Sequence, residues 1–388
     1  MATPKDVRID NTASILRVLM GGGSYSKAEI ARRTGMSKTL VGTIVNCLLD
    51  SEIAEWDTSS VRPQVQGGRP GQLIRMSESA GYVLGVDLYP DHIDQVVLDL
   101  NGNAVEATQI SGLGLVGGEL LEHLLHSLES SLQRMKHRVF AIGVASPGIV
   151  DMTSGSVESA LELNWRNVHV VEAICARTRI DAYLINRSTA GALYFARSDL
   201  SSINTVYMHI GTDVGAGLVV DGRIFAGSHG QAGEFGHVQV DPAGPVCRCG
   251  TRGCLETYLA SDYLARRLND MGISCVSNKA YEIVKAGIQN KDPMILRIYS
   301  DLVRYLKFGI DSVIRVVDPQ LICIGGEISV LGEALQDDLA ADMCRDLVHH
   351  RQLSDIKVIP FPQRLPGHGA GIYALEQALE LILKQAIG

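Results

Sequence analysis

From Gly81 onward, short apolar runs alternate with longer stretches in which apolar residues recur every three or four positions. The short runs are typical of buried strands and cover 82–87, 95–99, 140–144, 205–210, 217–220 and 321–324. The longer stretches have a helical period and cover 119–135, 168–178, 258–269 and 296–317. Strands that alternate with helices predict an α/β body. A strand followed by a glycine turn recurs in both halves, so we expect a duplicated fold whose ligand occupies a cleft between the halves.

Three short helices are predicted before residue 51. The first covers Asn11–Met20 and ends at three consecutive glycines, which cannot hold a helix. The second begins at Ser26, where Ser26-Lys-Ala-Glu29 has the pattern of a capping box. A turn at Thr34-Gly35-Met36 follows, and Ser37 caps a third helix that runs from Lys38 to Asp50.

The third predicted helix has one apolar and one polar face. Its apolar stripe consists of Leu40, Val41, Ile44, Val45, Leu48 and Leu49. Two short helices joined by a glycine turn, the second with a polar and basic start, are typical of the helix-turn-helix that enters the DNA major groove. A small helical bundle without a DNA-binding role is the alternative. The predicted DNA contacts on the polar face are Ser37, Lys38, Thr39, Thr43 and Asn46.

The segment from Arg62 to Arg75 is rich in glycine and proline. It predicts a tight β-hairpin that presents Arg69, the shape of a wing that reaches the minor groove or the phosphate backbone. A flexible linker between domains would have a similar composition, and the two readings are compatible. We therefore predict a winged helix-turn-helix domain over residues 1–76 and a larger body over residues 77–388.

Charge is unevenly distributed along the 388 residues, whose net charge is −8. Residues 1–75 carry ten Lys and Arg against seven Asp and Glu, a net charge of +3, which leaves −11 for the remainder. A basic head on an acidic body suits a protein whose N-terminal part alone meets phosphate. No apolar run follows the charged first residues, and none is as long as a membrane helix requires, so we expect a cytoplasmic protein with no membrane partner.

One imidazole and three thiols lie close together in the sequence, at His237, Cys247, Cys249 and Cys254. A Cys3His set with no fifth candidate nearby predicts a closed, structural zinc site over the loop 237–254. Glycines between the thiols allow the backbone to turn tightly. The alternative is a set of buried free cysteines. The other cysteines are expected to be reduced, and they are Cys47, Cys175, Cys275, Cys323 and Cys344.

Two motifs give the resemblance to a family. They are Glu234-Phe-Gly-His237 and the Cys-x-Cys-Gly-x-x-Gly-Cys-x-Glu pattern that ends at Glu256. Both resemble the signatures of the ROK family, named for repressors, open reading frames and kinases. A winged helix before such a body is similar to the repressor branch, which includes the xylose and N-acetylglucosamine repressors. The resemblance covers nearly the whole chain and implies an actin-like, two-lobed sugar-kinase fold.

Kinase positions of that family are altered in this chain. The first phosphate loop of family kinases reads Asp-x-Gly-Gly-Thr, whereas this chain has Asp87-Leu-Tyr-Pro-Asp91, which loses backbone donors and adds a repelling charge. The catalytic Asn-Asp pair is replaced by Asn186-Arg187, and a guanidinium cannot accept a proton from a sugar hydroxyl. The second loop, Gly211–Gly217, is largely intact but carries Asp213. We therefore expect no enzymatic activity.

The resemblance implies sugar contacts at Asn186, Glu234, His237 and Glu256, with His237 serving both the sugar and zinc. Buried polar groups satisfied by the backbone are the alternative reading of these residues. Zinc would fix the loop that carries three of them. We further hypothesise that Arg187 favours an anionic ligand, such as a sugar phosphate or sugar acid, over a neutral sugar. Alternatively, Arg187 pairs with a nearby acid such as Glu162.

The sequence thus predicts a transcriptional regulator, most simply a repressor, of carbohydrate-metabolism genes that responds to a sugar or sugar phosphate. One recognition helix reads only a few base pairs, so a homodimer or homotetramer on an inverted-repeat operator is expected. A ROK sugar kinase with an N-terminal extension is the alternative function. A repressor that has lost its sugar and responds to a protein partner is a third.

Overall fold

The computed structural model describes residues 4–20, 23–58, 72–77, 79–112, 114–198, 203–343, 355–360, 364–379 and 381–382. It forms two compact units. The first unit comprises residues 1–146, 151–185 and 370–388, and the second comprises 147–150 and 186–369. The division into residues 1–76 and 77–388 stays a prediction.

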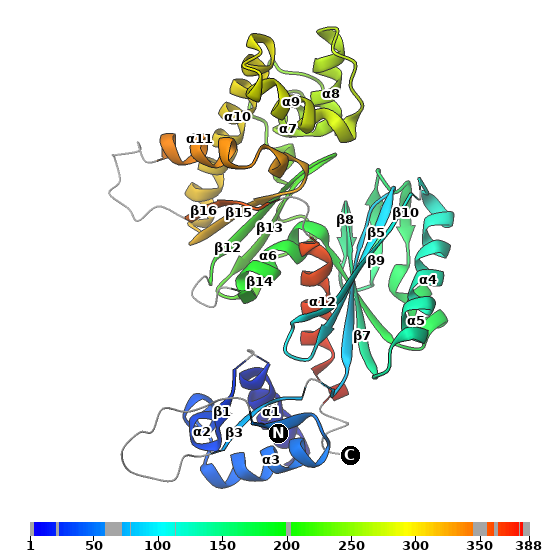
Figure 1. The fold of residues 1–388 in the computed structure, drawn as a ribbon, viewed down its shortest axis with the longest axis vertical. Helices are drawn as coiled ribbons and strands as arrows, with labels where there is room; N and C mark the ends of the chain where they lie inside the picture. The colour runs from blue at the N-terminus through cyan, green and yellow to red at the C-terminus, as the bar shows by residue number, and fades with distance from the viewer. Residues whose placement is uncertain are drawn as a thin grey trace. The chain divides into compact units, whose positions relative to one another are not determined.

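The N-terminal part of the first unit combines three helices with a small antiparallel sheet (Figure 1). The helices are α1 (Pro4–Leu19), α2 (Lys27–Thr34) and α3 (Lys38–Asp50), and the strands are β1 (Tyr25–Ser26), β2 (Ala54–Asp57) and β3 (Leu73–Met76). The strand order is β1-β3-β2. Leu16, Ile30, Leu48 and Ile74 belong to one buried apolar cluster, which joins the helices to the sheet.

The helix starts in this region follow from capping side chains. Ser26 Oγ accepts a hydrogen bond from the Glu29 N–H, and Ser37 Oγ accepts one from the Leu40 N–H. Gly35 ends α2 in the left-handed conformation, with φ of 71°, which glycine adopts without strain. The predicted bounds of α3 are confirmed, whereas α1 begins seven residues earlier than the predicted Asn11.

Leu40 does not belong to the buried stripe of α3 as predicted. It is 36% exposed, whereas Val41, Val45 and Leu48 are fully buried. At 100° per residue, Leu40 lies about 90° from the centre of the stripe, so its side chain lies at the rim of the apolar face. Leu40 is therefore an exposed apolar side chain at the border between the apolar and polar faces of α3.

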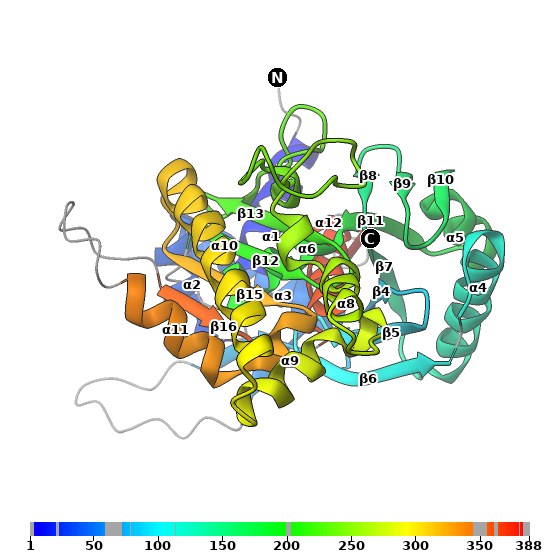
Figure 2. The ribbon, with the colours of Figure 1, turned by 90° about the horizontal axis from the view of Figure 1, so that it is seen from above.

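A five-stranded sheet forms the centre of the first unit, in the order β11-β7-β4-β5-β6. Helices α4 (Gly117–Arg134) and α5 (Val170–Thr178) lie on one side of it and α12 (Leu365–Gln377) on the other (Figures 1 and 2). A second, three-stranded sheet has the order β10-β9-β8. The strands are β4 (Tyr82–Leu88), β5 (His92–Asp99), β6 (Ala104–Ser111), β7 (Val139–Ser146), β8 (Ile149–Asp151), β9 (Ser156–Ala160), β10 (Trp165–Val168) and β11 (Asp181–Asn186).

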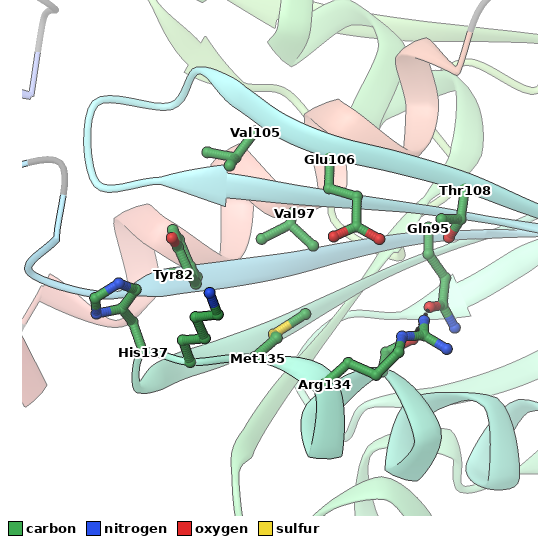
Figure 3. Close-up of a pocket in the computed structure, with 11 residues that line it drawn as sticks. Tyr82, Gln95, Val97, Val105, Glu106, Thr108, Arg134, Met135 and His137 are labelled. Carbon is green, nitrogen blue, oxygen red and sulfur yellow. Dashed lines mark hydrogen bonds between the residues drawn. The ribbon is translucent and has the colours of Figure 1, made fainter.

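A groove of about 220 Å³ lies between the β5–β6 edge of this sheet and the end of α4 (Figure 3). Its floor is a buried polar network rather than an apolar one. Gln95 Nε2 donates to Ser127 Oγ at 2.9 Å, Ser131 Oγ donates to Gln95 Oε1 at 2.5 Å, and Arg134 Nη2 donates to Ser131 Oγ at 3.2 Å. The buried side chains of Gln95, Ser127 and Ser131 satisfy one another, and the exposed Arg134 adds one more donor, which fixes α4 on the sheet.

The second unit repeats this design with a sheet in the order β14-β13-β12-β15-β16. Helix α6 (Arg187–Ser198) packs on one face. The other face is covered by α7 (Glu256–Leu259), α8 (Ser261–Asp270), α9 (Ala280–Gln289) and α10 (Pro293–Val317), and α11 (Glu333–Met343) follows (Figure 1). The strands are β12 (Thr205–Ile210), β13 (Val214–Val220), β14 (Arg223–Ile224), β15 (Leu321–Gly325) and β16 (Asp355–Val358).

Both sheets have the same connectivity, which confirms the predicted duplication. β4 pairs antiparallel with β5 and parallel with β7, and β12 pairs antiparallel with β13 and parallel with β15. Alternating side chains of β12 enter different cores: Val206, Met208 and Ile210 face the α10 side, while Tyr207 packs with Ala192 of α6.

The predicted strands of the α/β body all occur, with ends shifted by a few residues, and so do three of the four predicted helices. The helix predicted over 258–269 is instead two helices, α7 and α8, because the backbone is extended at Ala260, with ψ of 141°. Sequence reasoning did not find the strands β6, β8–β10, β11, β14 and β16 or the helices α6, α9, α11 and α12. Among the described residues, no helix is both long enough and apolar enough to cross a bilayer.

Candidate metal and ligand site

The four predicted zinc ligands come together in the second unit. The ligand atoms of His237, Cys247, Cys249 and Cys254 all lie within 4.8 Å of one another. The Cys247 Sγ to His237 Nδ1 distance is 3.6 Å, and the Cys249 Sγ to Cys254 Sγ distance is also 3.6 Å. A tetrahedral zinc ion separates its nitrogen and sulfur ligands by about 3.6–3.8 Å. The donor set and its spacing therefore fit zinc, with Nδ1 as the imidazole ligand.

Tight backbone turns bring the thiols together. The Gly250 N–H donates to the Cys247 carbonyl at 2.9 Å, and Gly250 has φ of 89°. At Gly253, with φ of 65°, a Cβ atom would lie 1.5 Å from the Asp241 carbonyl oxygen, so a side chain there would displace the loop. Gln239 and Cys254 form an antiparallel bridge, which ties the loop to the segment after His237.

The pKa values of the clustered thiols differ from one another. Burial and hydrogen bonds from the other thiols raise the pKa of Cys254 to about 12. Burial opposes ionisation of Cys249 too, but hydrogen bonds from Thr251 and the thiols lower its pKa to about 7. Three adjacent thiolates repel one another, so a bound divalent cation would favour their joint ionisation. The described cysteines are all free thiols, and Cys344 lies outside the described residues.

Glu256 begins α7 directly after the metal cluster and is 2% exposed. Its Oε1 accepts a hydrogen bond from Arg248 Nε at 2.6 Å. Arg248 Nη2 also donates to the Thr212 carbonyl at 2.6 Å, and the Arg248 backbone N–H donates to the Tyr263 hydroxyl at 2.9 Å. Arg248 is the functional candidate that sequence reasoning missed. Its position between the two thiols of the Cys-x-Cys motif was the available signal.

Glu234 and His237 lie on the same short turn, with His237 at the end of a 3₁₀ helix that spans Phe235–His237. His237 Nε2 is 3.9 Å from Glu234 Oε2, so the ring points one nitrogen at the thiols and the other at this carboxylate. Burial raises the pKa of Glu234, although the nearby His237 opposes the shift. Glu234 and Glu256 therefore lie just before and just after the loop that carries the four candidate metal ligands, His237 among them.

Asn186 and Arg187 lie at the start of α6. Asn186 Oδ1 accepts from the backbone N–H groups of Ser188 and Thr189, and Asn186 Nδ2 donates to the Gly148 carbonyl at 2.9 Å. Asn186 thus caps α6, and most of its hydrogen-bonding capacity serves the backbone. Arg187 is 2% exposed, and its charge acts on Asp213 by lowering that group's pKa against a larger opposing effect of burial.

Asp213 lies in the turn between β12 and β13, where it adds a third carboxylate to the site. Burial raises its pKa, with Arg187 opposing and Glu256 adding to the shift. Asp213 Oδ1 and Ser261 Oγ are buried and make no hydrogen bond within the described part of the chain. The Ser261 N–H, at the start of α8, donates to the Gly211 carbonyl at 2.8 Å, which connects α8 to the turn that carries Asp213. Such groups mark a position where a ligand or water supplies the missing partner.

The predicted DNA contacts that the structure describes are all exposed on one side of α3. They are Ser37, Lys38, Thr39, Thr43 and Asn46. Asn46 Oδ1 accepts a hydrogen bond from Lys27 Nζ of α2 at 2.8 Å, which adds a basic side chain to this face. Arg69 and the rest of the predicted wing tip lie outside the described residues, whereas β2 and β3 on either side pair antiparallel.

The family model described as "ROK family" matches residues 83–372. The chain belongs to the ROK family. This assignment confirms the resemblance drawn from Glu234-Phe-Gly-His237 and the cysteine motif. Two curated relatives are a xylose repressor of Bacillus subtilis, 24% identical over 82% of each chain, and the DNA-binding transcriptional dual regulator NagC of Escherichia coli. The latter is 28% identical over 84% of this chain and 82% of its own length.

Solved structures of ROK proteins have the same fold. A ROK family transcriptional regulator, a homologue of the Escherichia coli MLC protein, matches 98% of this chain and 99% of its own with a TM-score of 0.79 and 24% identity. A ROK family glucokinase from Streptomyces griseus, solved with glucose and AMPPNP, matches 76% of this chain and 99% of its own with a TM-score of 0.65 and 22% identity. The actin-like, two-lobed fold predicted from sequence is thereby confirmed.

Proposed function

We propose that this ROK protein is a DNA-binding transcriptional regulator, most simply a repressor, of carbohydrate-metabolism genes. Its kinase-like body binds a sugar or sugar phosphate without phosphorylating it. The observation that carries this proposal is Arg187, a buried guanidinium at the α6 position where the family's kinases have their catalytic carboxylate. It stays protonated and cannot act as a general base. Relatives named as repressors support the same reading.

The altered first phosphate loop also supports a loss of phosphoryl transfer. In the β4–β5 turn the ring of Tyr89 stacks on His92 with centroids 4.1 Å apart, and Asp91 Oδ1 lies 2.8 Å from His92 Nδ1. The Tyr89 N–H donates to the His92 carbonyl, which leaves it unavailable to a phosphate. A closed hairpin with a carboxylate at its tip is a poor phosphate cradle.

DNA binding is assigned to the N-terminal helices and sheet. The exposed face of α3, with Lys38 near its start, has the chemistry of a recognition helix, and Lys27 of α2 adds charge beside Asn46. The winged helix-turn-helix assignment over residues 1–76, with Arg69 at the wing, is part of this proposal. A homodimer or homotetramer would present two such helices to an inverted repeat.

Zinc has a structural role in this proposal. When bound, it joins four protein ligands and leaves no open position for chemistry. His237, Cys247, Cys249 and Cys254 would hold it, and the loop that results carries Glu234 and Glu256. The sugar contacts are assigned to Asn186, Arg187, Glu234, His237 and Glu256. Ligand binding would favour one arrangement of the DNA-binding heads, which changes operator affinity by a population shift.

Two assays on one preparation separate the regulator from the kinase alternative. Fluorescence anisotropy of DNA from the chain's own upstream region should report tight, salt-sensitive binding. ADP release from ATP and Mg²⁺ should not rise above background with glucose, xylose, N-acetylglucosamine or mannose. Sugar-dependent ADP release without DNA binding would contradict the proposal and favour the kinase.

A further inference from the structure

Arg248 occupies an unusual position, between two metal ligands and beside the ligand site. Its backbone is held by Cys247 and Cys249 on either side and by the Tyr263 hydroxyl. Its side chain, 28% exposed, reaches Glu256 of the ligand site and the carbonyl of Thr212 in the adjoining turn. The Arg248 guanidinium therefore connects the loop of the candidate metal ligands to Glu256 and to the turn that contains Thr212.

The Arg248–Glu256 pair changes what the site offers to a ligand. Glu256 is the more buried partner, with a side chain 3% exposed. Its Oε1 accepts a 2.6 Å charge-assisted hydrogen bond from Arg248 and a longer one, at 3.7 Å, from the Cys247 thiol. Separating the pair would leave a buried carboxylate without its counter-charge, which is strongly unfavourable. A sugar hydroxyl that contacts Glu256 must therefore bind without displacing Arg248 from Oε1.

Arg248 retains donors that the protein does not use. A guanidinium carries five N–H groups. Nε and Nη2 donate to Glu256 and Thr212, whereas Nη1 makes no hydrogen bond within the described part of the chain. Its charge also reaches Asp213, the residue that follows Thr212. Unused N–H donors on a guanidinium whose other donors are already engaged are suited to bind a carboxylate or phosphate.

An acceptor lies beside these donors. Asp213 Oδ1 is buried and makes no hydrogen bond among the described residues, although His209 Nε2 lies 4.0 Å from it. Ser261 Oγ, at the start of α8, is also buried without a hydrogen bond there. A sugar hydroxyl could donate to Asp213 Oδ1 and accept from the Ser261 hydroxyl. Arg187, on the α6 side, adds a second guanidinium that acts electrostatically on Asp213.

We infer that Arg248 is a specificity-determining residue that selects a carbohydrate bearing an anionic group. It neutralises Glu256 and also donates to the carbonyl of Thr212, the residue before Asp213, whose Oδ1 makes no hydrogen bond among the described residues. The inference rests on the proposed sugar-binding function and narrows it to sugar acids or sugar phosphates. The anion contacts Arg248, and a neighbouring hydroxyl donates to Asp213.

Calorimetric titration of the zinc-loaded protein tests this inference with three matched probes: glucose, gluconate and glucose 6-phosphate. The wild type should bind gluconate or glucose 6-phosphate at least about tenfold more tightly than glucose, and the stronger of the two identifies the anionic group as carboxylate or phosphate. Arg248→Gln should lower the affinity for the acidic ligand by roughly ten- to a hundredfold, because it removes hydrogen bonds to a charged group. Arg248→Lys, which keeps the charge, should retain part of the preference.

Arg252→Gln is the matched control, because Arg252 lies on the same loop but is exposed and donates only to the Gly244 carbonyl, at 3.4 Å. It should bind both ligand types as the wild type does. Zinc content is measured for every variant to show that the loop is intact. Equal or tighter binding of glucose, the same preference in Arg248→Gln, or no binding of any probe would each overturn the inference. Operator binding by the same wild-type sample would still support the proposed function.

Discussion

His237 Nδ1 lies 3.6 Å from Cys247 Sγ, a separation that one tetrahedral zinc ion can span. The opposite ring nitrogen, Nε2, faces Glu234 at 3.9 Å. One imidazole thus links the metal cluster to the ligand side of the loop. Because a metal bond fixes the ring's orientation, zinc would also fix the position of the Nε2 donor.

Removing one thiol should release the metal. Cys249→Ser is expected to lower the zinc content from one ion per chain to near zero, as measured by atomic absorption. The melting temperature should fall by roughly 4–8 °C, corresponding to about 2 kcal/mol in a unit of this size. Cys275→Ser, outside the cluster, is the control and should keep its zinc. A full complement of zinc in Cys249→Ser would refute this ligand set.

The close packing of β13 against α6 depends on the absence of a side chain at Gly217, in the middle of the strand. A Cβ atom there would lie 2.0 Å from the Ser188 carbonyl oxygen, in the first turn of the helix that carries Arg187. Gly217→Ala should therefore destabilise the protein by about 1–3 kcal/mol or more in urea unfolding. Gly118→Ala in α4, where an added Cβ meets nothing within 4 Å, should be neutral or stabilising. Similar effects of the two changes would argue against this packing.

The α3 face should contribute to DNA affinity through charge. Lys38→Ala is expected to weaken binding to the upstream DNA by roughly three- to tenfold and to reduce the slope of log affinity against log salt by about one. Anisotropy titrations at several salt concentrations measure both quantities. Lys279→Ala, an exposed lysine of the second unit, should leave the slope unchanged. A slope unaffected by Lys38→Ala would remove this residue from the interface.

Asp213 should make stability depend on pH. Burial raises its pKa in the folded state, so the folded protein binds a proton at this site more readily than the unfolded chain. Protonation of Asp213 therefore stabilises the folded protein fully below the pKa of the unfolded carboxyl group, near pH 4. This stabilisation is lost as the pH rises through the raised pKa of Asp213 in the folded protein. Asp213→Asn, which mimics the protonated form, should therefore raise the melting temperature at pH 7, with a gain that shrinks toward pH 4. A lower melting temperature at pH 7 would show that the pairing with Arg187 outweighs burial.

Local patterns allowed much of the fold and the metal cluster to be predicted from sequence. The zinc ligands lie within 18 positions of one another, so the turns at Gly250 and Gly253 bring them together without help from distant segments. Buried strands such as Thr205–Ile210 are continuous apolar runs and were found with correct ends. Helix α6 was missed because its buried residues include Arg187, Ser188 and Thr189, so an apolar pattern does not mark its buried face.

Relationships between distant residues were not predictable in this way. The Arg248 side chain contacts Thr212, 36 positions away, through the tertiary arrangement of β12, β13 and the loop of the candidate metal ligands. The Asn186 side chain also donates from Nδ2 to the Gly148 carbonyl, which lies 38 positions earlier. The exposed side chain of Leu40 reflects its angular position at the rim of α3, where a small rotation of the helix decides between burial and exposure.

Coupling between the ligand site and the DNA-binding part is the central claim. Its most direct test is an anisotropy titration of upstream DNA with the zinc-loaded protein, repeated with saturating glucose, gluconate, glucose 6-phosphate, xylose and N-acetylglucosamine. The account predicts that DNA affinity changes at least about fivefold with one acidic ligand, in either direction, and that the change is lost in Arg248→Gln. DNA affinity that is identical with and without every ligand would contradict it.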